Sequence, residues 1–545
     1  MDRVCVLSFA MTVWAMVLCA SSAAGGVIRG EVVDADTGRV VPARVYIRAA
    51  GGGWHFAKSA AAGGSAVEYR VKRFANCVEM HTTLSAHPFL ADVPAGRYTL
   101  RAERGKECLP AEKTVEVAGD PVKVKLALKR WIDMSAAGWY SGDTHVHRTV
   151  AELRNLLPAE DLNIALPLTY WVTVSHRSPL TGRARPAKPP AAEPIAVDAT
   201  HVIWPVNTEY EIFQTAGRRH TLGAVFVLGH NRPLDFGTPP VAPIAERARK
   251  EGALLDLDKH SWPWSLMLVP VMNVDLFELA NNHLWRTEFG FRQWGADVAP
   301  EYMKLERDRR GLTEWGWIDF GFQTYYALLN CGFRLRVTAG TASGVHPVPL
   351  GFGRVYVHLP GGFSYAKWMA GLDAGRSFVT TGPMLTVRVA DRPAGATLRL
   401  KADGDHRLQV TGRAVGPRPL RAIEVIVNGE VAARVKAENR KTERGGYECP
   451  LDVHVRVGGS SWVAVRAFED RPDKRVRFAH SGPVHVEVPG KPLRPRRVEA
   501  EYFVRRMKQE LKRNEKVLKA AELAEYRQAL AAYEACLSRA RQEGD

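Results

Sequence analysis

Two histidines separated by a single residue, His145 and His147, lie in the stretch GWYSGDTHVHR at residues 138–148. On a β-strand, residues i and i+2 point to the same face. The rise of about 3.3 Å per residue then lets both imidazoles reach one metal ion. Asp143 points the same way one step earlier, where an acid commonly orients a ligand histidine. The alternative is a pair of surface histidines on an ordinary strand.

The sequence around this pair is rich in histidine. Eight of the 17 histidines fall between residues 145 and 283, where an even spread would place about four. This excess favours a metal site in that window. Lys259, Arg148 and Arg232 also lie there and could hold an anionic group of a substrate. For each of these three cations, a solvated surface position is the simpler interpretation.

The elements that must position these residues alternate between strand and helix patterns. Between residues 131 and 390, apolar β runs such as NIALPLTYWVTV, GAVFVLG and VDLFELANN alternate with helical stretches such as APIAERARKEGALLDLD. Such alternation predicts an α/β domain. The intervening SHRSPLTGRARPAKPPAAEP is rich in Pro and Arg and is expected to be a surface loop.

β patterns and a helical tail flank this domain. Residues 25–130 alternate apolar and polar positions between Asp/Gly turns, which predicts a small antiparallel β-sandwich. Residues 391–490 predict a second sandwich and carry Asn428-Gly429, the strongest hairpin signal. In the helical residues 491–545, an apolar seam favours a hairpin packed back on the protein, with dimerisation as the alternative. This seam consists of Leu523, Tyr526, Leu530, Tyr533 and Leu537.

The first 24 residues have the composition of a secretory signal peptide. A basic start at Arg3 is followed by an apolar run and then by small residues. We expect cleavage near Ala24 and a secreted or periplasmic protein; a lipoprotein reading through Cys19 is weaker, because Met16-Val17-Leu18 precede it. No later segment has 18 consecutive apolar residues, so no membrane span is expected.

Charge and cysteine content narrow the partners and the covalent structure. The formal net charge is +17, but no motif combining aromatic and basic residues points to nucleic acid. We therefore read the charge as a surface property suited to acidic polymers or an anionic envelope. Five cysteines remain after the signal segment. In an oxidising compartment, one bridge is possible, and Cys77 with Cys108 is the predicted pair.

Several motifs resemble one known superfamily. GDTHVHR resembles the first metal motif of the PHP (polymerase and histidinol phosphatase) superfamily, and residues 140–390 are similar to its carbaryl-hydrolase-like (CehA/McbA-type) branch. PVNTEYE, GRRHTLGAVFVLG, LLDLDKHSWPW, VDLFELANN and LDAGRSFVTTGPML resemble later family segments in the family's order. The resemblance implies a distorted β/α barrel with metals at its C-terminal mouth. In the first sandwich, GEVVDADTGRVVPARVYI and DVPAGRYTLRAERG resemble the carboxypeptidase-regulatory-like module, an accessory domain.

The same resemblance assigns roles to particular residues. It implies one or two divalent ions, Zn, Mn or Fe, held by His145, His147, Glu209, His220 and His260. Glu209 could bridge metals or take a proton from water, and His260 is the second candidate for a catalytic role. Glu278 and Asn281 are placed near the pocket, where with Asp143 they would support the ligands.

The sequence also departs from the family pattern. RTVAELRNLL lacks the Asp-Gly pair that usually follows the first motif. Where the family usually has Thr-Asp-His, this sequence has Thr169-Tyr170-Trp171. Where the family usually has Ser-Asp-Ser-His, this sequence has Thr341 to Gly344. An aspartate and two histidines are therefore missing, so we expect fewer than three ions. His176 or His346 could substitute, although each is more simply an ordinary loop histidine.

These observations predict a secreted metal-dependent hydrolase, in which an activated water attacks an ester, phosphoester or carbamate bond. The alternative is a catalytically degenerate PHP-like protein that binds a polysaccharide or an envelope component. A purely structural surface protein is a third class. The substrate, a small molecule or a polysaccharide, and the oligomeric state are left open.

Overall fold

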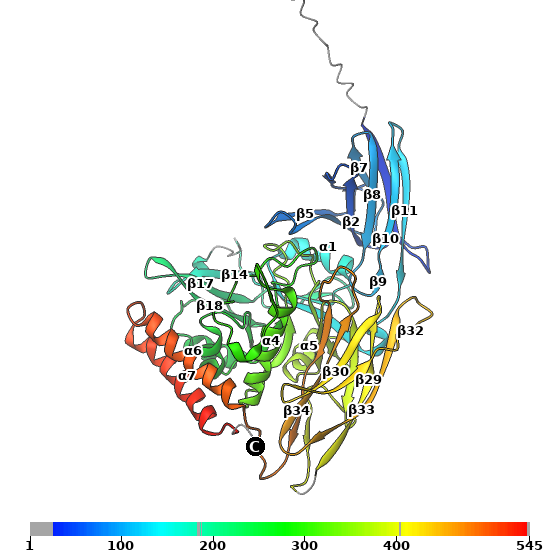
Figure 1. Cartoon of the computed structure of the whole chain (residues 1–545). Coiled ribbons are helices and arrows are strands. Elements are labelled where there is room, and N and C mark those ends of the chain that lie inside the picture. The colour runs from blue at the N-terminus through cyan, green and yellow to red at the C-terminus, as the bar shows by residue number, and fades with distance from the viewer. Residues whose placement is uncertain (1–24, 183–185, 187, 403–404, 542–545) are drawn as a thin grey trace, which may run out of the picture.

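The structure is a computed structural model that describes residues 25–182, 186, 188–402 and 405–541. The expected signal peptide at residues 1–24 lies outside this range. Figure 1 shows a β-sandwich at the N-terminal end, an α/β unit, a second β unit and a helical hairpin on the outer flank. The chain is therefore multidomain and combines α/β with all-β parts, as the sequence predicts.

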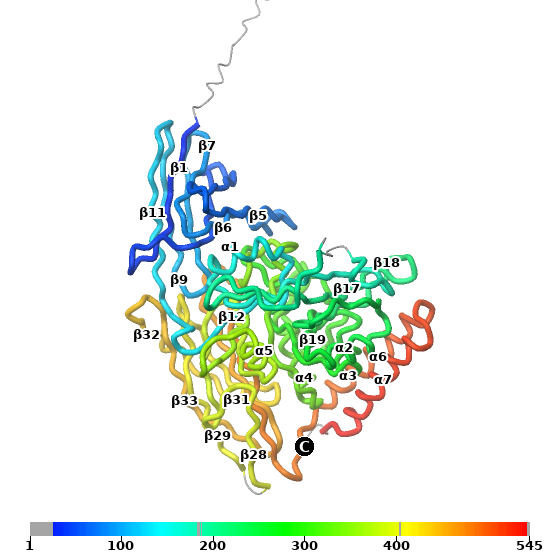
Figure 2. The backbone as a smooth tube through the Cα atoms, turned by 180° about the vertical axis from the view of Figure 1, so that it is seen from behind, coloured from blue at the N-terminus to red at the C-terminus, as the bar shows by residue number. Residues whose placement is uncertain are grey.

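The N-terminal unit is a sandwich of two sheets around a core that includes Ile28, Val45 and Leu100. Its strand β11 alternates buried and exposed residues, as a half-buried strand should. Views from both sides show β5 reaching out over α1 of the α/β unit (Figures 1 and 2). In spatial order, the first sheet comprises β4 (Lys58–Ser59), β7 (Phe89–Val93), β1 (Gly26–Asp34), β11 (Val122–Arg130) and β9 (Cys108–Leu109). The second comprises β10 (Ala111–Val117), β8 (Gly96–Glu103), β2 (Ala43–Ala49), β6 (Val78–Leu84) and β5 (Ala66–Lys72), with β3 (Trp54–His55) paired to β2.

A 12-stranded sheet begins in the α/β unit and continues into the second β unit. The join is the antiparallel pair of β25 with β35, in which Val379 faces His480. The units predicted to separate at residue 390 therefore share one sheet. Its strands in order are β15 (Ile195–Ala196), β16 (Val202–Ile203), β13 (Ile164–Pro167), β12 (Trp139–Val146), β24 (Arg354–His358), β25 (Ser377–Thr380), β35 (Phe478–Ser481), β34 (Ser461–Glu469), β30 (Leu420–Val427) and β31 (Glu430–Lys436), with β36 (Val484–Glu487) paired to β34 and β28 (Thr397–Arg399) paired to β36.

A six-stranded sheet forms the other half of the α/β unit. Near the point where the two sheets meet, Val146 of the 12-stranded sheet makes a single parallel bridge to Ser343, a residue outside the named strands. No continuous ladder joins them, so the described residues form two open sheets and not the expected barrel. The strands in order are β14 (Tyr170–Val174), β17 (Thr208–Thr215), β18 (Arg218–Leu228), β19 (Leu254–Leu257), β20 (Leu276–Ala280) and β23 (Arg336–Ala339).

The helices are α1 (Val150–Glu160), α2 (Ala242–Glu251), α3 (Ser265–Met272), α4 (Glu314–Asn330) and α5 (Tyr365–Asp373), and the remaining short elements are η1 (Ser135–Ala137), η2 (Pro179–Thr181), η3 (Glu301–Met303), β21 (Arg307–Asp308) and β22 (Gly311–Leu312).

The second β unit packs a five-stranded sheet against the shared sheet. Its order is β27 (Arg392–Pro393), β26 (Met384–Val389), β29 (His406–Gly416), β33 (Tyr447–Val457) and β32 (Arg440–Lys441). The predicted hairpin turn connects β30 to β31, with φ of 51° at Asn428 and 92° at Gly429. Positive φ at both turn residues is what the Asn-Gly pair favours.

The C-terminal helices α6 (Arg497–Asn514) and α7 (Ala520–Ser538) form a hairpin on the α/β unit. Tyr526 and Tyr533 of the predicted seam are buried, and the Tyr533 hydroxyl donates to the carbonyl of Leu266 at 2.7 Å. The seam therefore packs on the α/β unit of the same chain, as predicted for a hairpin that folds back on the protein. No helix of the described chain has the length and apolar character needed to cross a membrane.

The five cysteines of the described chain are free thiols. Cys77 is buried against Trp285, whereas Cys108 lines a cavity to which Cys77 does not contribute. The predicted bridge between Cys77 and Cys108 is therefore wrong, because residence in one domain does not bring two side chains together.

Candidate metal centre

Four buried side chains converge from four strands of the two sheets. His145 stands near the C-terminal end of β12, Asp258 directly follows β19, Glu278 lies on β20, and Glu209 lies near the start of β17. Each is at most 1% exposed. Their meeting point lies at strand ends, which is where α/β folds generally build their sites.

The distances between these side chains are those of a compact polar cluster. His145 Nδ1 lies 3.0 Å from Glu278 Oε2 and 3.7 Å from Asp258 Oδ1, and His147 Nε2 lies 3.4 Å from Glu209 Oε2. Three overlapping groups have ligand atoms within 4.8 Å of one another. They are His145–His147–Glu209, His145–Asp258–Glu278 and Glu209–Glu211–Asp258.

Asp143 supports this cluster through the backbone. Its carboxylate accepts hydrogen bonds from the backbone N–H of His145 at 3.1 Å and of Gly351 at 2.9 Å. It also accepts from the Thr341 hydroxyl at 2.6 Å and from the Thr341 N–H at 3.2 Å. Asp143 therefore fixes the strand that carries His145, while Glu278 holds the imidazole ring.

Burial pushes both acids and histidines of the cluster toward their neutral forms. It raises the pKa of Glu209 and of Glu278 well above the usual value, with help from nearby carboxylates. It lowers the pKa of His145 far below its usual value and that of His147 to about 3. Lys259, buried and paired with Asp258, is the cation within the cluster. Burial thus supplies the neutral imidazoles that ligate metals, whereas the carboxylates must lose their protons to do so. A bound cation would stabilise those carboxylates as anions.

Two buried carboxylate oxygens have no hydrogen-bond partner. They are Glu209 Oε2 and Asp258 Oδ1, which lie close to His147 and His145 respectively but do not form hydrogen bonds with them. Leaving a buried polar atom unsatisfied costs about 1–3 kcal/mol. Carboxylate oxygens without a hydrogen-bond partner, next to two histidines, are ligands that a divalent transition metal ion accepts. The residues present therefore fit such an ion.

His260 lies in an aromatic layer next to the cluster. Its ring is 4.6 Å from the rings of both Trp317 and Phe320, and neither ring nitrogen has a hydrogen-bond partner. His283 stacks on Phe291 at 3.5 Å, and burial, followed by the charge of Lys259, lowers its pKa well below the usual value. His260 is thus buried nearby but belongs to none of the three close ligand groups.

Asn281 orders the loop that carries His283. Its Oδ1 accepts from the His283 N–H at 3.1 Å and from the Trp317 indole at 3.4 Å. Asn281 therefore supports the loop that follows β20, the strand that carries Glu278.

The structure does not bring His220 to this cluster. Its Nε2 lies 2.7 Å from Oδ1 of Asn514 on α6. Phe226 of the same strand packs on His145, and His220 stands six residues earlier, roughly 20 Å along β18. His176 behaves similarly, since it contacts Glu522 of α7 at 2.7 Å.

Trp171 belongs to one of the motifs that depart from the family pattern, and its side chain lies beside the cluster. Its ring lies 4.8 Å from that of His147, and its indole N–H donates to Glu211 Oε2 at 3.1 Å. Thr341, at the other departure, holds Asp143. Both positions therefore support neighbours of the cluster and contribute no metal ligand.

Sequence reasoning missed Asp258 and Glu211. Glu211 follows Glu209 at i+2 on β17, so the rule that paired His145 with His147 also applied to it. Asp258 directly follows the buried strand β19, two residues before His260. A carboxylate just after a buried strand was the signal that could have indicated it. His346, which the sequence suggested only as a substitute for a missing ligand, is buried. Its ring centre lies 6.2 Å from that of His283.

The N-terminal sandwich contacts the loops around the cluster. The hydroxyl of Tyr69 on β5 donates to the His346 carbonyl at 2.6 Å and accepts from the Gly344 N–H at 2.7 Å. Arg148 lies over the Tyr69 ring at 4.6 Å. The accessory sandwich therefore helps to fix the segment that follows β23.

Comparisons with known proteins give no relative: no family model, no curated protein and no solved structure matches this chain. The centre is therefore interpreted from its own chemistry.

Proposed function

We propose that this protein is an exported metal-dependent hydrolase whose ion is held by His145, His147, Glu209 and Asp258. One observation carries the proposal: buried imidazoles and carboxylates surround one point, and two of the carboxylate oxygens lack any partner there. The resemblance of its motifs to those of PHP-type hydrolases supports the same interpretation, and the composition of residues 1–24 supports export.

The residues around the ion have distinct tasks. Glu278 orients His145 through Nδ1, which leaves Nε2 for coordination. Glu209 Oε2 can accept a proton from water, because burial raises its pKa well above the usual value. Lys259 Nζ can hold an anionic oxygen of a substrate. When bound, a Zn, Mn or Fe ion supplies Lewis acidity and lowers the pKa of its water to about 7.

This set of parts suits esters, phosphoesters and carbamates, since hydrolysis of each needs an activated water and a stabilised oxyanion. Glu211 and Trp171, beside His147, are partly exposed residues around the cluster. A substrate would therefore approach from their side.

The alternative is a PHP-like protein that holds an ion without turnover and binds an envelope component or a polysaccharide. The burial of the centre favours this second candidate, because the side chains of His145 and His147 are only 1% and 6% exposed. A structural ion site is closed, whereas a catalytic site keeps an open position.

Metal analysis combined with a substrate panel separates the two functions. Protein purified without chelators is analysed for Zn, Mn and Fe. It is then assayed on p-nitrophenyl phosphate, bis(p-nitrophenyl) phosphate, p-nitrophenyl acetate and 1-naphthyl N-methylcarbamate, beside Glu209→Gln. One or two ions with turnover that Glu209→Gln abolishes supports the hydrolase. Ions without turnover favour the second candidate, and a metal-free protein that takes up none of the three removes the hydrolase.

A further inference from the structure

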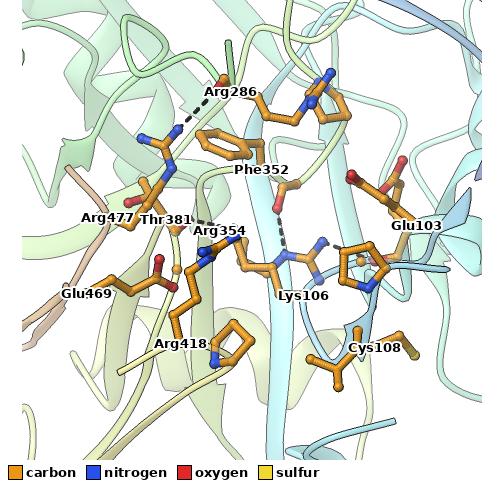
Figure 3. Close-up of a pocket in the computed structure, with 18 of the residues that line it drawn as sticks. Glu103, Lys106, Cys108, Arg286, Phe352, Arg354, Thr381, Arg418, Glu469 and Arg477 are labelled. Atoms are coloured by element: carbon orange, nitrogen blue, oxygen red, sulfur yellow. Dashed lines mark hydrogen bonds between the residues drawn. The ribbon is translucent and has the colours of Figure 1, made fainter. Parts of the chain in front are cut away.

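A cavity of about 680 Å³ lies where the N-terminal sandwich, the α/β unit and the second β unit meet. Lys106 comes from the first of these, Arg354 from the second and Arg418 from the third (Figure 3). The ligand-type side chains of the candidate metal centre do not line it. It is therefore a separate site, of the size that small-molecule ligands occupy.

The wall of this cavity carries an excess of positive charge. Eight Arg or Lys side chains line it, against four Glu or Asp. Each of the four acids already lies in an ion pair with an arginine of the same wall: Glu103 and Glu160 with Arg44, and Glu469 and Asp473 with Arg471. Arg101 shares Glu103, and Arg286 pairs with Glu79, which is not among the lining residues. The other four lining cations, Lys106, Arg354, Arg418 and Arg477, form no ion pair with a carboxylate of the wall.

Arg354 is the most deeply buried of these cations. It is 1% exposed, and its guanidinium donates to the backbone carbonyls of Gly351 at 2.7 Å, Asp161 at 3.0 Å and Glu160 at 3.0 Å. These bonds satisfy its N–H groups but leave its charge without a bonded carboxylate. A buried charge of this kind is costly unless an opposite charge lies near.

Arg477 adds a second buried charge. Its closest carboxylate, Glu314, is 3.4 Å away and already accepts two bonds from Arg475, at 2.6 and 2.8 Å. Its guanidinium lies 4.9 Å from the centre of the Phe352 ring, so the aromatic face provides part of its stabilisation.

Lys106 stands on the same aromatic ring, with its Nζ 4.6 Å from the ring centre. Its ammonium donates to the Thr381 carbonyl at 2.9 Å and keeps further N–H donors for a ligand. Burial, followed by the charges of Arg354 and Arg477, lowers the pKa of Lys106 well below its usual value. An anion in the cavity would reverse that penalty.

Arg418 supplies a free donor at the rim. It is exposed, and its side chain makes no hydrogen bond or ion pair with any part of the chain that the structure describes. Lys106 and Arg418 are therefore the groups able to bind a ligand directly, whereas Arg354 and Arg477 provide the field behind them.

We propose that this cavity binds a small polar molecule bearing an oxyanion, such as a carboxylate or a phosphate on a sugar-sized body. The oxyanion lies against Lys106 and is closed in by Arg418. The body fills the remaining volume, which a bare inorganic ion leaves empty. Because residues of three units form the wall, the ligand also joins those units.

Isothermal titration calorimetry on the full chain tests this inference, with D-glucose 6-phosphate and D-glucuronate as probes. D-Glucose is the neutral control and inorganic phosphate the control for an ion without a body, all at one ionic strength. We expect saturable binding of at least one acid and none of glucose at tenfold higher concentration. No saturable binding by either acid, or binding of inorganic phosphate alone, overturns the proposal.

Two variants locate the binding in this cavity. Lys106→Met and Arg418→Gln should each weaken the acid at least tenfold, while Arg407→Gln, at an exposed position on β29, should leave it unchanged. If Lys106→Met fails to fold, the rim variant still decides. Unchanged affinity in Arg418→Gln, or an equal loss in Arg407→Gln, contradicts the assignment. Metal content, measured in the same samples, should not change, so this result is independent of the proposed hydrolase.

Discussion

The imidazole of His145 is held by Glu278 across two different sheets, with Nδ1 3.0 Å from Oε2. His145 belongs to the 12-stranded sheet and Glu278 to the six-stranded sheet. Both side chains are buried, so this contact fixes the ring where the sheets meet. A carboxylate in this position sets the tautomer and raises the basicity of a ligand histidine.

Replacing His147 by alanine should reduce metal affinity by at least about 100-fold, since loss of a group that only supports a ligand already costs 10–100-fold. The remaining donors cannot close the coordination sphere. Bound metal is measured in the parent, in His147→Ala and in His406→Ala, a control in the second β unit where the imidazole forms a hydrogen bond with the Lys401 carbonyl. Parent-like metal content in His147→Ala would show that the two histidines are merely neighbours on a strand.

Glu209→Gln and His220→Ala should have opposite outcomes. The first keeps the shape of the side chain but removes the charge beside His147, so metal affinity should fall at least about tenfold. The second removes a contact with Asn514 on α6, so metal content should match the parent. Equilibrium dialysis against Zn and Mn measures both. Loss of metal in His220→Ala alone would reverse the assignment of the ligands.

The contact between Glu79 and Arg286 should make the docking of the N-terminal sandwich sensitive to acid. Burial of Glu79 opposes its ionisation, but Arg286 and then His81 outweigh this and lower its pKa to about 2. The folded pKa is depressed, so the stabilisation is complete above pH 4.5 and is lost as pH falls toward 2. It amounts to about 3 kcal/mol at pH 7.

Thermal unfolding at pH 7, 4 and 3 checks this expectation. Glu79→Gln should melt below the parent at pH 7, and the difference should shrink as the pH falls. Glu116→Gln, at an exposed position on β10, is the matched control. A constant difference at all three pH values would show that ionisation of Glu79 contributes nothing.

Oxidation should join Cys331 to Cys536, and not Cys77 to Cys108. Cys536 Sγ lies 3.7 Å from the Cys331 carbonyl oxygen, and a hydrogen bond with the Cys331 thiol lowers the pKa of Cys536 to about 7. The thiolate is the reactive form, so diamide should oxidise this pair to a disulfide and itself be reduced. Peptide mapping without reductant should find Cys331 joined to Cys536 and should find Cys77 free. Cys536→Ser is the control, and a Cys77–Cys108 peptide would contradict the structure.

Local patterns predicted much of the fold. The i, i+2 spacing of His145 and His147 and the Asn428-Gly429 turn depend on a few neighbouring residues, so the sequence predicted both. The apolar seam of α7 likewise indicated its buried face. Each of these features is decided within one element.

Features decided between elements were harder to predict. Whether two sheets close into a barrel depends on pairing between distant strands, and here a single bridge at Val146 replaces a ladder. His220 has the residue type of a ligand, yet its distance along β18 from Phe226 places it at the helical hairpin. Asp258 was missed because a carboxylate at a strand end has no distinctive spacing.

The antiparallel pair of β25 with β35 limits where recombination can divide the gene for this protein. A gene break near residue 390 would leave β25 with an unpaired edge and would remove the strands that continue its sheet, which invites aggregation. Recombination should therefore pass residues 131–490 on as one piece. The N-terminal sandwich has both of its sheets to itself, so it is the part of the chain that evolution can exchange.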